Sequence, residues 1–380
     1  MTAFSDDMRR RALLAGLSIR ALAVAIPVDP SHLARIARGE RQPTPELATA
    51  IDRHLNADGE LAALAERRPC TPAEQSGDGR RPLDDADAER IRDTIAHLVS
   101  LDTAHGSDGL HGVAARAFRS EADHLAVAGA TTAADADIKA AVAELGEVAA
   151  WLAYDAEQQD TSRAVASEAL LIARMAGDTS MERFLLSHLS MQAVYLGRGA
   201  EGLAIADRVL ADEPMSERVR GMFAVRRARA LALLGSGEAL DELGRARSVL
   251  LEGVGPGDPQ WTWWLHEAEM AIHEARIRAA TDDRRGAVTA SHRAVASLPE
   301  RQGRDGVLYR AWLLRDLVDA HAWRDAEQVA RDLIARADVA GTARVPRIVR
   351  GALAQVEGPA GQRVPRWLRD AVREAARTWT

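Results

Sequence analysis

The sequence has 380 residues, of which 47% are hydrophobic, 28% charged and only 4% aromatic. This length predicts two or more domains, and the apolar fraction excludes a chain that is disordered throughout. We expect a cytoplasmic protein, because the sequence has no apolar run that could span a membrane, no secretory signal pattern and a single cysteine.

A pair of short helices is predicted within residues 1–68, the first expected domain. Ser18 is a favourable N-cap for a helix over 19–26, and Asp29 for a helix over 30–38, where proline occupies the first helical position. The turn between the two helices is short, so the helices must pack against each other. Such a pair, supported by neighbouring helices, is typical of a helix-turn-helix domain.

The apolar positions of this region predict one small core. Thr44 and Pro45 give a further helix start, and we expect five helices in the domain. The core positions share a helical spacing and are Leu22, Ala23, Ile26, Val28, Leu33, Ile36, Leu47, Ile51 and Leu55.

Charge is distributed unevenly along the chain. The formal net charge is −7, which argues against nucleic-acid binding by the chain as a whole. Residues 8–55, however, hold eight arginines and four acidic residues, a balance of +4. The sequence therefore predicts a basic N-terminal head on an acidic remainder.

Residues 8–64 resemble the phage-repressor type of helix-turn-helix, the xenobiotic-response-element family. The matching positions are Gly16, Leu17, Ser18, Leu22, Ala23, Val28, Ser31, Leu33, Arg35, Ile36, Arg38, Gly39, Arg41 and Pro43. The resemblance implies that helix 30–38 is the recognition helix. It places Ser31 and Arg35 at the base edges, where an arginine can contact a guanine bidentately. Ser31 and His32, near the helix N-terminus, can serve either a base or a phosphate. The resemblance places Arg20, Arg38 and Arg41 at the phosphate backbone.

Two departures from the family pattern leave alternatives open. Pro27 replaces the usual turn glycine, and Pro30 and Ala34 stand where polar side chains often read bases. The alternatives are a helical bundle with a solvated arginine face, and a vestigial head kept for protein contacts.

A second domain is expected over 85–380, after a linker over 69–84 that is rich in proline, glycine and charge. Alanines recur near the start of every second predicted helix, at spacings of 36, 39, 48 and 39 residues. They are Ala164, Ala200, Ala239, Ala287 and Ala326. These spacings are near those of helical-pair repeats, so the sequence predicts an α-solenoid.

This second domain resembles the tetratricopeptide-like domain of actinobacterial regulators that carry such heads. The segments that carry the resemblance are 151–178, 190–198, 258–275 and 321–331. The fold class implied is all-α, with the helix-turn-helix head followed by a tetratricopeptide-like array that senses a ligand or dimerises.

Two groups in the array are candidate effector contacts. Trp261, Trp264 and His266 follow a glycine- and proline-rich loop, and they form either inter-repeat core or an aromatic ligand wall. Arg226 and Arg229 lie one helical turn apart and are suited to clamp a carboxylate, such as a peptide C-terminus. The alternative for them is a solvated face, shared with Arg218, Arg220 and Arg227.

Enzymatic chemistry is not expected. His266, Glu269 and His273 have a spacing that permits a metal ion, but the HExxH pattern and further cysteines are missing, so we predict no metal and no cofactor. No phosphate-binding loop or nucleophile elbow occurs either.

The sequence as a whole predicts a DNA-binding transcriptional regulator. We expect a homodimer on an inverted-repeat operator in double-stranded DNA, with a peptide, small molecule or protein as effector of the array. The alternative function is a protein-interaction scaffold with a vestigial head.

Overall fold

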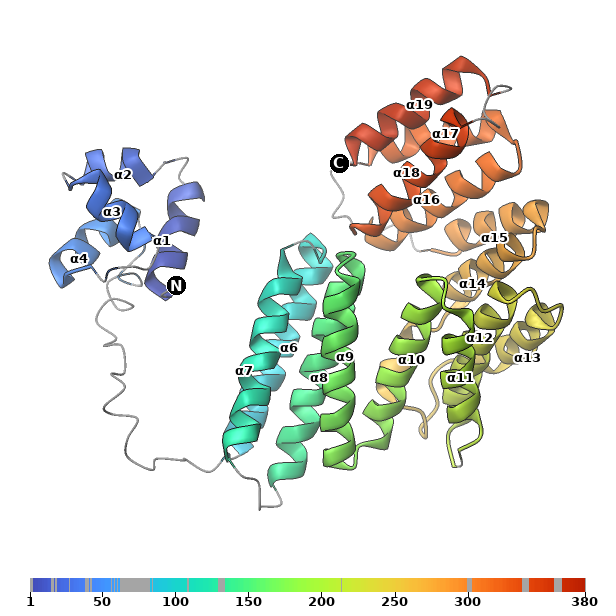
Figure 1. The fold of residues 1–380 in the computed structure, drawn as a ribbon, viewed down its shortest axis with the longest axis horizontal. Coiled ribbons are helices and arrows are strands. Elements are labelled where there is room, and N and C mark those ends of the chain that lie inside the picture. The colour runs from blue at the N-terminus through green and yellow to red at the C-terminus, as the bar shows by residue number, and fades with distance from the viewer. Residues whose placement is uncertain are drawn as a thin grey trace. The chain divides into compact units, whose positions relative to one another are not determined.

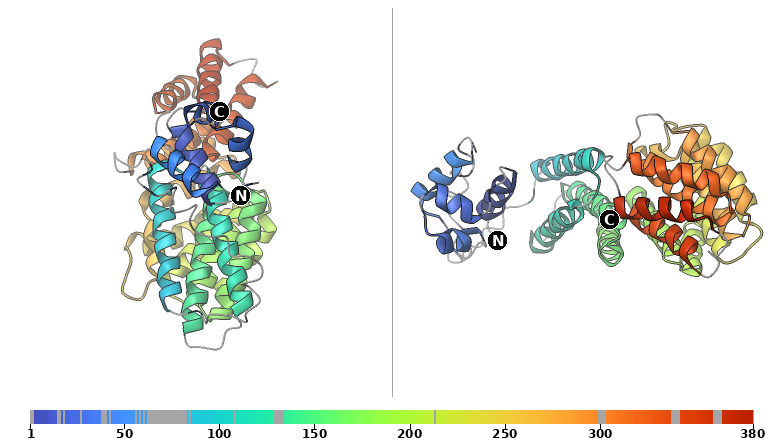
Figure 2. Two further views of the ribbon diagram at one scale, coloured as in Figure 1. Left: turned by 90° about the vertical axis from the view of Figure 1, so that its left-hand side faces the viewer. Right: turned by 90° about the horizontal axis from the view of Figure 1, so that it is seen from above.

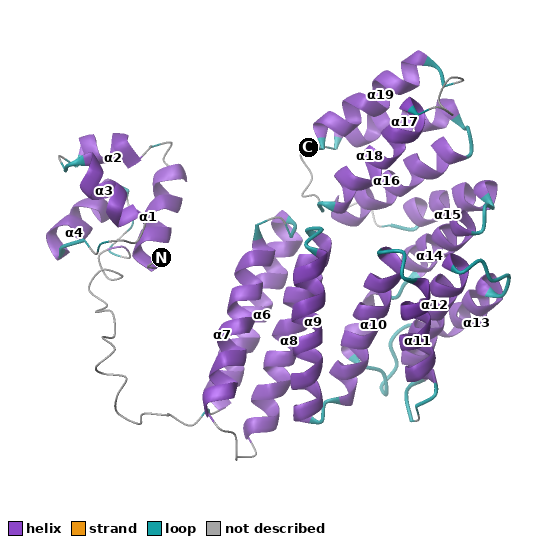
Figure 3. Ribbon diagram, in the orientation of Figure 1, coloured by secondary structure: helices purple, strands orange, loops and turns teal. Residues whose placement is uncertain are grey.

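The structure of the protein is a computed structural model that divides into two compact units, Met1–Arg80 and Arg81–Thr380. It describes residues 3–14, 17, 19–26, 28–37, 41, 43–55, 57, 59, 61, 83, 85–107, 109–128, 134–212, 214–298, 303–336, 342–358 and 364–379. Every regular element in these ranges is a helix (Figure 3), which confirms the predicted all-α class. The expected linker, apart from Leu83, lies outside them.

The N-terminal unit contains the predicted short helices. Its described helices are α1 (Ala3–Leu14), α2 (Ile19–Ala25), α3 (Pro30–Ala37) and α4 (Pro45–His54). The Asp29 carboxylate accepts the backbone N–H of His32 at 2.9 Å, and the Thr44 hydroxyl accepts that of Leu47 at 3.3 Å. The predicted cap at Asp29 and the predicted helix start at Thr44 are thus confirmed, whereas the predicted cap Ser18 lies outside the described residues. The expected fifth helix lies outside the described residues.

The head has its own apolar core, built from all four helices. All nine core positions expected from the sequence belong to it, and Leu22, Leu33 and Ile51 are fully buried. Phe4 and Met8 of α1 are also fully buried there, and the sequence reasoning had not included them. The core fixes which face of each short helix points outward.

The C-terminal unit is a row of antiparallel helical hairpins that follow one another in chain order (Figure 1). Its helices are α6 (Asp85–His105), α7 (Leu110–Ala128), α8 (Ala134–Asp155), α9 (Gln159–Ala176), α10 (Thr179–Tyr195), α11 (Gly199–Leu210), α12 (Glu217–Leu233), α13 (Ala239–Leu251), η2 (Gln260–Trp264), α14 (Glu267–Ala280), α15 (Arg284–Ala296), α16 (Gly303–Asp319), α17 (Trp323–Ala335), α18 (Arg344–Glu357) and α19 (Arg366–Thr378). The first helices of neighbouring hairpins pack together along α6, α8, α10, α12 and α14, and α16 packs on α18.

The turn inside the hairpins repeats regularly. It places one residue in the left-handed region in each of five hairpins, at Glu157, Gly197, Gly235, Asp282 and His321. These positions recur after 40, 38, 47 and 39 residues, and the long interval contains η2 and the predicted loop. The expected helical-pair repeat is therefore present.

Two of the alanines chosen as repeat markers are wrong. Ala164 and Ala200 are exposed, whereas the buried small residues are Ser162 and Gly202. In α9, α11, α15 and α17 the fourth residue of the second helix is buried, and a Cβ at Gly202 would lie 2.7 Å from Val194 Cγ2. Neighbouring small residues made the register ambiguous in the sequence. The other three markers, Ala239, Ala287 and Ala326, are buried as expected.

The array curves as it proceeds. Figures 1 and 2 show that α6–α9 run nearly parallel, whereas α16–α19 are inclined to them. Three contiguous apolar clusters, centred on α8, α12 and α16, fill it from one end to the other. Among the described residues, no helix combines the length and apolar character needed to cross a bilayer.

Candidate functional sites

The outer face of α3 is the candidate DNA interface. Leu33, Ile36 and Ala37 point into the head's core, so the opposite side of this two-turn helix faces solvent. Arg35 is exposed on that side, and His32 is half-exposed one turn before it. The apolar spacing of α3 thus presents predicted base-reading side chains outward.

Arg35 and Arg41 have the freedom that a nucleic-acid contact needs. Both side chains are exposed, and neither makes an ion pair or hydrogen bond with any residue in the described part of the chain. A guanidinium in this state has all five donors available for a base edge or phosphate.

The other predicted DNA contacts are less fully described. Arg20 lies in α2 and Ser31 in the first turn of α3, and their side chains are outside the described set. Arg38 lies outside the described residues altogether. The structure therefore places the backbone of Arg20 and Ser31 but not their contacts.

Comparison with protein families agrees with this geometry. Residues 3–65 match a family described as helix-turn-helix domain. No curated protein and no solved structure matches the chain. The N-terminal unit therefore contains a helix-turn-helix domain, and the match ends before the array begins.

Trp261, a predicted effector contact, joins η2 to α10. Its ring stacks on Phe184 with centroids 4.4 Å apart and planes 4° from parallel. Its indole N–H donates to the Ser180 hydroxyl at 3.0 Å. These contacts use one ring face and the only polar atom of Trp261 for packing between repeats.

His266 begins α14. Its Nδ1 accepts the backbone N–H of Glu269 at 3.4 Å, so the imidazole acts as the N-cap. The carboxylate of Glu269 turns instead to His273 and Tyr309. In the part of the chain that the structure describes, no cluster of three or more histidine, cysteine or acidic side chains is arranged to hold a metal ion.

The arginines of α12 differ sharply in their surroundings. The solvated-face alternative is wrong for Arg218 and Arg226, which are only 3% and 5% exposed. Arg218 donates five hydrogen bonds of 2.7–3.1 Å to Thr262 and to the carbonyls of Leu250, Gly253 and Leu265. It therefore holds the loop before α14 in place.

Arg226, Arg229, Glu269 and His273 form what we call the arginine cluster, between α12 and α14. Arg229 donates to Nδ1 of His273 at 3.3 Å, and Nε2 of the same ring lies 3.2 Å from the Glu269 carboxylate. Because a guanidinium only donates, Nδ1 must accept, and the ring proton then sits on Nε2, facing Glu269. Arg226 donates to the Ser187 hydroxyl at 3.0 Å and lies 5.4 Å from the Trp264 ring centroid.

Burial governs the protonation of the arginine cluster. It lowers the pKa of Arg229 to about 10, assisted by the charges of Arg276 and Arg226. Burial and the neighbouring guanidiniums also lower the pKa of His273, which is therefore neutral at pH 7. Burial would raise the pKa of Glu269, but hydrogen bonds from His273 and Tyr309 bring it down to about 2. The cluster thus holds two cations beside one firmly ionised carboxylate.

Tyr154 of α8 and Arg344 of α18 also lie in the interior of the array, although their helices are far apart in the sequence. The Arg344 guanidinium lies 5.1 Å from the Tyr154 ring centroid and also forms an ion pair of 2.8 Å with Asp155. Arg304 of α16 pairs with the same carboxylate, which also accepts the Ser107 hydroxyl at 2.8 Å. Sequence reasoning missed these residues, because only the curvature of the array brings α8 to α18.

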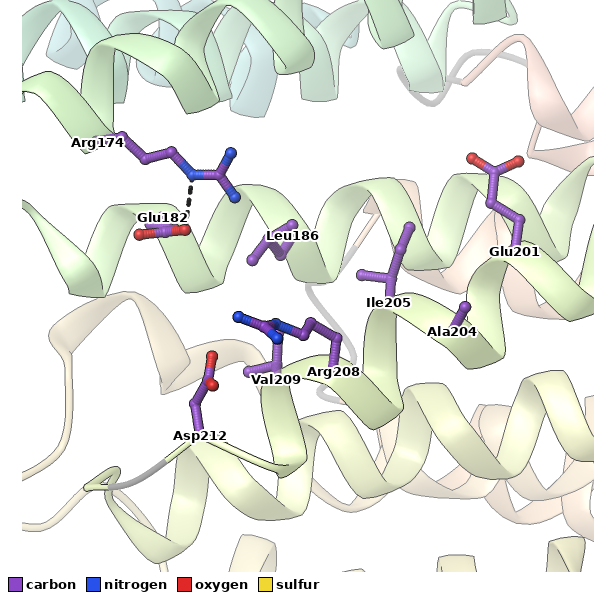
Figure 4. Close-up of a pocket in the computed structure, with 9 residues that line it drawn as sticks. All are labelled: Arg174, Glu182, Leu186, Glu201, Ala204, Ile205, Arg208, Val209 and Asp212. Atoms are coloured by element: carbon purple, nitrogen blue, oxygen red, sulfur yellow. Dashed lines mark hydrogen bonds and ion pairs between the residues drawn. The ribbon is translucent and has the colours of Figure 1, made fainter.

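A separate hollow of about 370 Å³ lies between α9, α10 and α11 (Figure 4). Its floor is apolar, and charged side chains surround it, with Arg174 donating to Glu182 at 2.8 Å. The lining residues are Arg174, Glu182, Leu186, Glu201, Ala204, Ile205, Arg208, Val209 and Asp212. None of the residues predicted as effector contacts lines it.

Proposed function

We propose that this protein is a cytoplasmic transcriptional regulator whose α3 docks in the major groove of DNA. The observation that carries the proposal is the exposed Arg35 on a helix whose opposite face is locked into the head's core. Such a helix is held rigidly while its outward arginine reaches a base edge, and a bidentate contact to guanine then reads sequence.

The remaining contacts of the head serve mainly to position it. Arg41, and by the family resemblance Arg20 and Arg38, meet the phosphate backbone. Ser31 and His32 lie in the first turn of α3, where backbone N–H groups and the helix dipole favour a phosphate. The head therefore combines one principal base reader with several backbone contacts.

The array gives the head its regulation in this proposal. One head covers only a half-site, so two copies bind an inverted repeat as a homodimer. A peptide, small molecule or protein that favours one arrangement of the array changes the spacing or freedom of the two heads. The continuous core of the array supports this role, because a packed solenoid transmits a change at one hairpin to its neighbours.

A mobility-shift assay on the protein's own upstream DNA tests the proposal. Arg35→Ala should lower affinity for the specific site by about 10- to 100-fold and leave affinity for unrelated DNA nearly unchanged. Arg41→Ala should weaken binding to both DNAs alike. Arg53→Ala removes an exposed arginine from the last turn of α4 and is the matched control.

Two results would contradict the proposal in different ways. Unchanged sequence preference in Arg35→Ala would remove the assigned base reader. No DNA binding by the wild-type chain, even at low salt, would favour the scaffold with a vestigial head.

A further inference from the structure

We propose that the arginine cluster is a binding site for a small oxyanion, a carboxylate or a phosphate, gripped by Arg226 and Arg229. This inference rests on the proposed function only in taking the anion to be the effector of the array. The site itself stands on the contacts of the interior between α8, α12 and α14.

The two guanidiniums lack an acidic partner. Among the described residues, no carboxylate oxygen lies within 4.0 Å of either one. Their hydrogen-bond partners are the neutral Ser187 hydroxyl and the neutral His273 ring. The nearest acid, Glu269, is already engaged by His273 and Tyr309. Most of the donor capacity of Arg226 and Arg229 is therefore unused.

Two other arginines inside the array show that an enclosed guanidinium can be paired with an acidic side chain. Arg276 pairs with the buried carboxylate of Asp316, and Arg344 pairs with Asp155. Charge removed from water is costly unless a counter-charge replaces the lost hydration. Arg218 also lacks an ion pair, but five hydrogen bonds satisfy its donors. Arg226 and Arg229 have neither an ion pair nor such a set of hydrogen bonds, and an incoming anion would supply the missing counter-charge.

The unused donors remain reachable from solvent. Nη1 and Nη2 of Arg226 have no hydrogen-bond partner among the described residues, yet neither atom is one of the fully buried unpaired groups. Water therefore reaches these nitrogens although the side chain as a whole is only 5% exposed. A small anion can take the same position as this water.

Aromatic rings complete the surroundings. The Trp264 ring lies beside the Arg226 guanidinium, and Tyr154 packs against Tyr195 with ring centroids 5.2 Å apart. The Trp264 ring limits the amount of water around the Arg226 guanidinium, which strengthens an ionic contact there. The chemistry selects an anion with at least two acceptor oxygens.

Thermal unfolding of the full chain, with sodium phosphate or sodium citrate as the probe, tests the site. Ionic strength is held constant with sodium chloride, so that general screening does not change. Both probes are expected to raise the melting temperature saturably, and the tighter one identifies phosphate or carboxylate as the source. Arg226→Gln and Arg229→Gln should each weaken the apparent affinity by about tenfold or more.

Arg227→Gln is the matched control, because it removes the same charge from α12. Arg227 points away from the cluster and pairs with Asp207 at 2.8 Å. Its response to both probes should equal that of the wild type. If Arg226→Gln does not fold, Arg229→Gln alone decides the result.

Two outcomes would overturn the site. One is the absence of saturable stabilisation by either probe, and the other is an equal response in Arg229→Gln and Arg227→Gln. The assay contains no DNA, so such a failure leaves the function of the head untested and intact. Conversely, a head that does not bind DNA would leave saturable anion binding unchanged.

Discussion

The outer face of α3 carries one arginine and the inner face of α12 carries two, and the surroundings of these side chains differ. Arg35 extends into water from a small head. Arg226 is nearly enclosed by the hairpins of the array. Neither guanidinium has an ion pair among the described residues. The first position suits a long polyanion that docks from outside, and the second suits only a small anion that enters.

This difference shows that the surroundings of an arginine decide what it can bind. The exposed charge on α3 costs little and is screened by salt, so its contacts depend strongly on ionic strength. The enclosed charge on α12 is poorly hydrated, so it gains more from a single counter-ion. Three substitutions in the array test how much each enclosed charge depends on its partners.

The largest effect is expected for Asp155→Asn. The substitution removes the one carboxylate that pairs with Arg344 among the described residues, and it leaves Arg304 with Asp102 as its remaining acidic partner. The array should lose about 3–5 kcal/mol of unfolding free energy, measured by urea denaturation. Asp282→Asn is the control, because its ion pair with Arg284 is highly exposed and is worth at most about 1 kcal/mol.

The Asp155 contribution also has a defined pH dependence. Arg344 and Arg304, helped by Ser107, lower the pKa of Asp155 despite its burial. Its stabilisation is therefore complete above the ordinary aspartate value of 3.8 and is lost as pH falls through the lower folded value. The difference between wild type and Asp155→Asn should narrow in acid. A stability difference that does not change with pH would contradict the assignment of this stabilisation to the ion pairs of Asp155.

Arg218→Met tests whether burial alone makes an anion site. Arg218 is as enclosed as Arg226, but its five hydrogen bonds hold the loop before α14. The substitution should cost about 2–3 kcal/mol and increase cleavage of that loop by protease. Arg220→Met, on the same helix and close to the exposed Glu217, should cost less than about 1 kcal/mol. Loss of the phosphate response in Arg218→Met would contradict the site at Arg226 and Arg229.

A smaller effect is expected for His273→Gln. The groups that face this ring are Arg229 and Arg226 from α12 and Glu269 from its own helix. Since its folded pKa lies below the ordinary histidine value of 6.5, its contribution is present above that value and is lost as pH falls. Wild type should lose up to about 1.4 kcal/mol per pH unit between pH 7 and 5 from this group.

Glutamine at position 273 retains an acceptor for Arg229 and a donor for Glu269 but does not titrate. The stability of His273→Gln should therefore vary less between pH 7 and 5 than that of the wild type, measured by urea denaturation at each pH. Equal pH dependence in the two proteins would show that His273 is not the group responsible.

The head was predictable because its signals are local. Asp29 and Thr44 mark helix starts within three residues of the groups they cap, and the apolar positions of α3 repeat within two turns. The array was predictable in outline, since its hairpins recur along the chain. Its marker alanines were misplaced at Ala164 and Ala200, because adjacent small residues do not reveal which one faces inward.

The interior of the array was beyond sequence reasoning for a different reason. The spacing of Arg226 and Arg229 marked them as a possible pair, but their burial depends on helices that are distant in the sequence. Arg344 meets Asp155 across 189 positions of the chain. No periodicity within one helix specifies such a pairing, because it results from the accumulated curvature of successive hairpins.

The salt dependence of DNA binding by the full chain tests the central claim most directly. Fluorescence anisotropy of a labelled duplex from the upstream region would be followed from about 50 to 200 mM salt. We predict that log K falls linearly, that Arg41→Ala reduces the slope by about 1, and that Arg226→Gln leaves it unchanged. The account is contradicted if the wild-type chain has no DNA affinity at the lowest salt, or if the slope changes with Arg226 and not with Arg41.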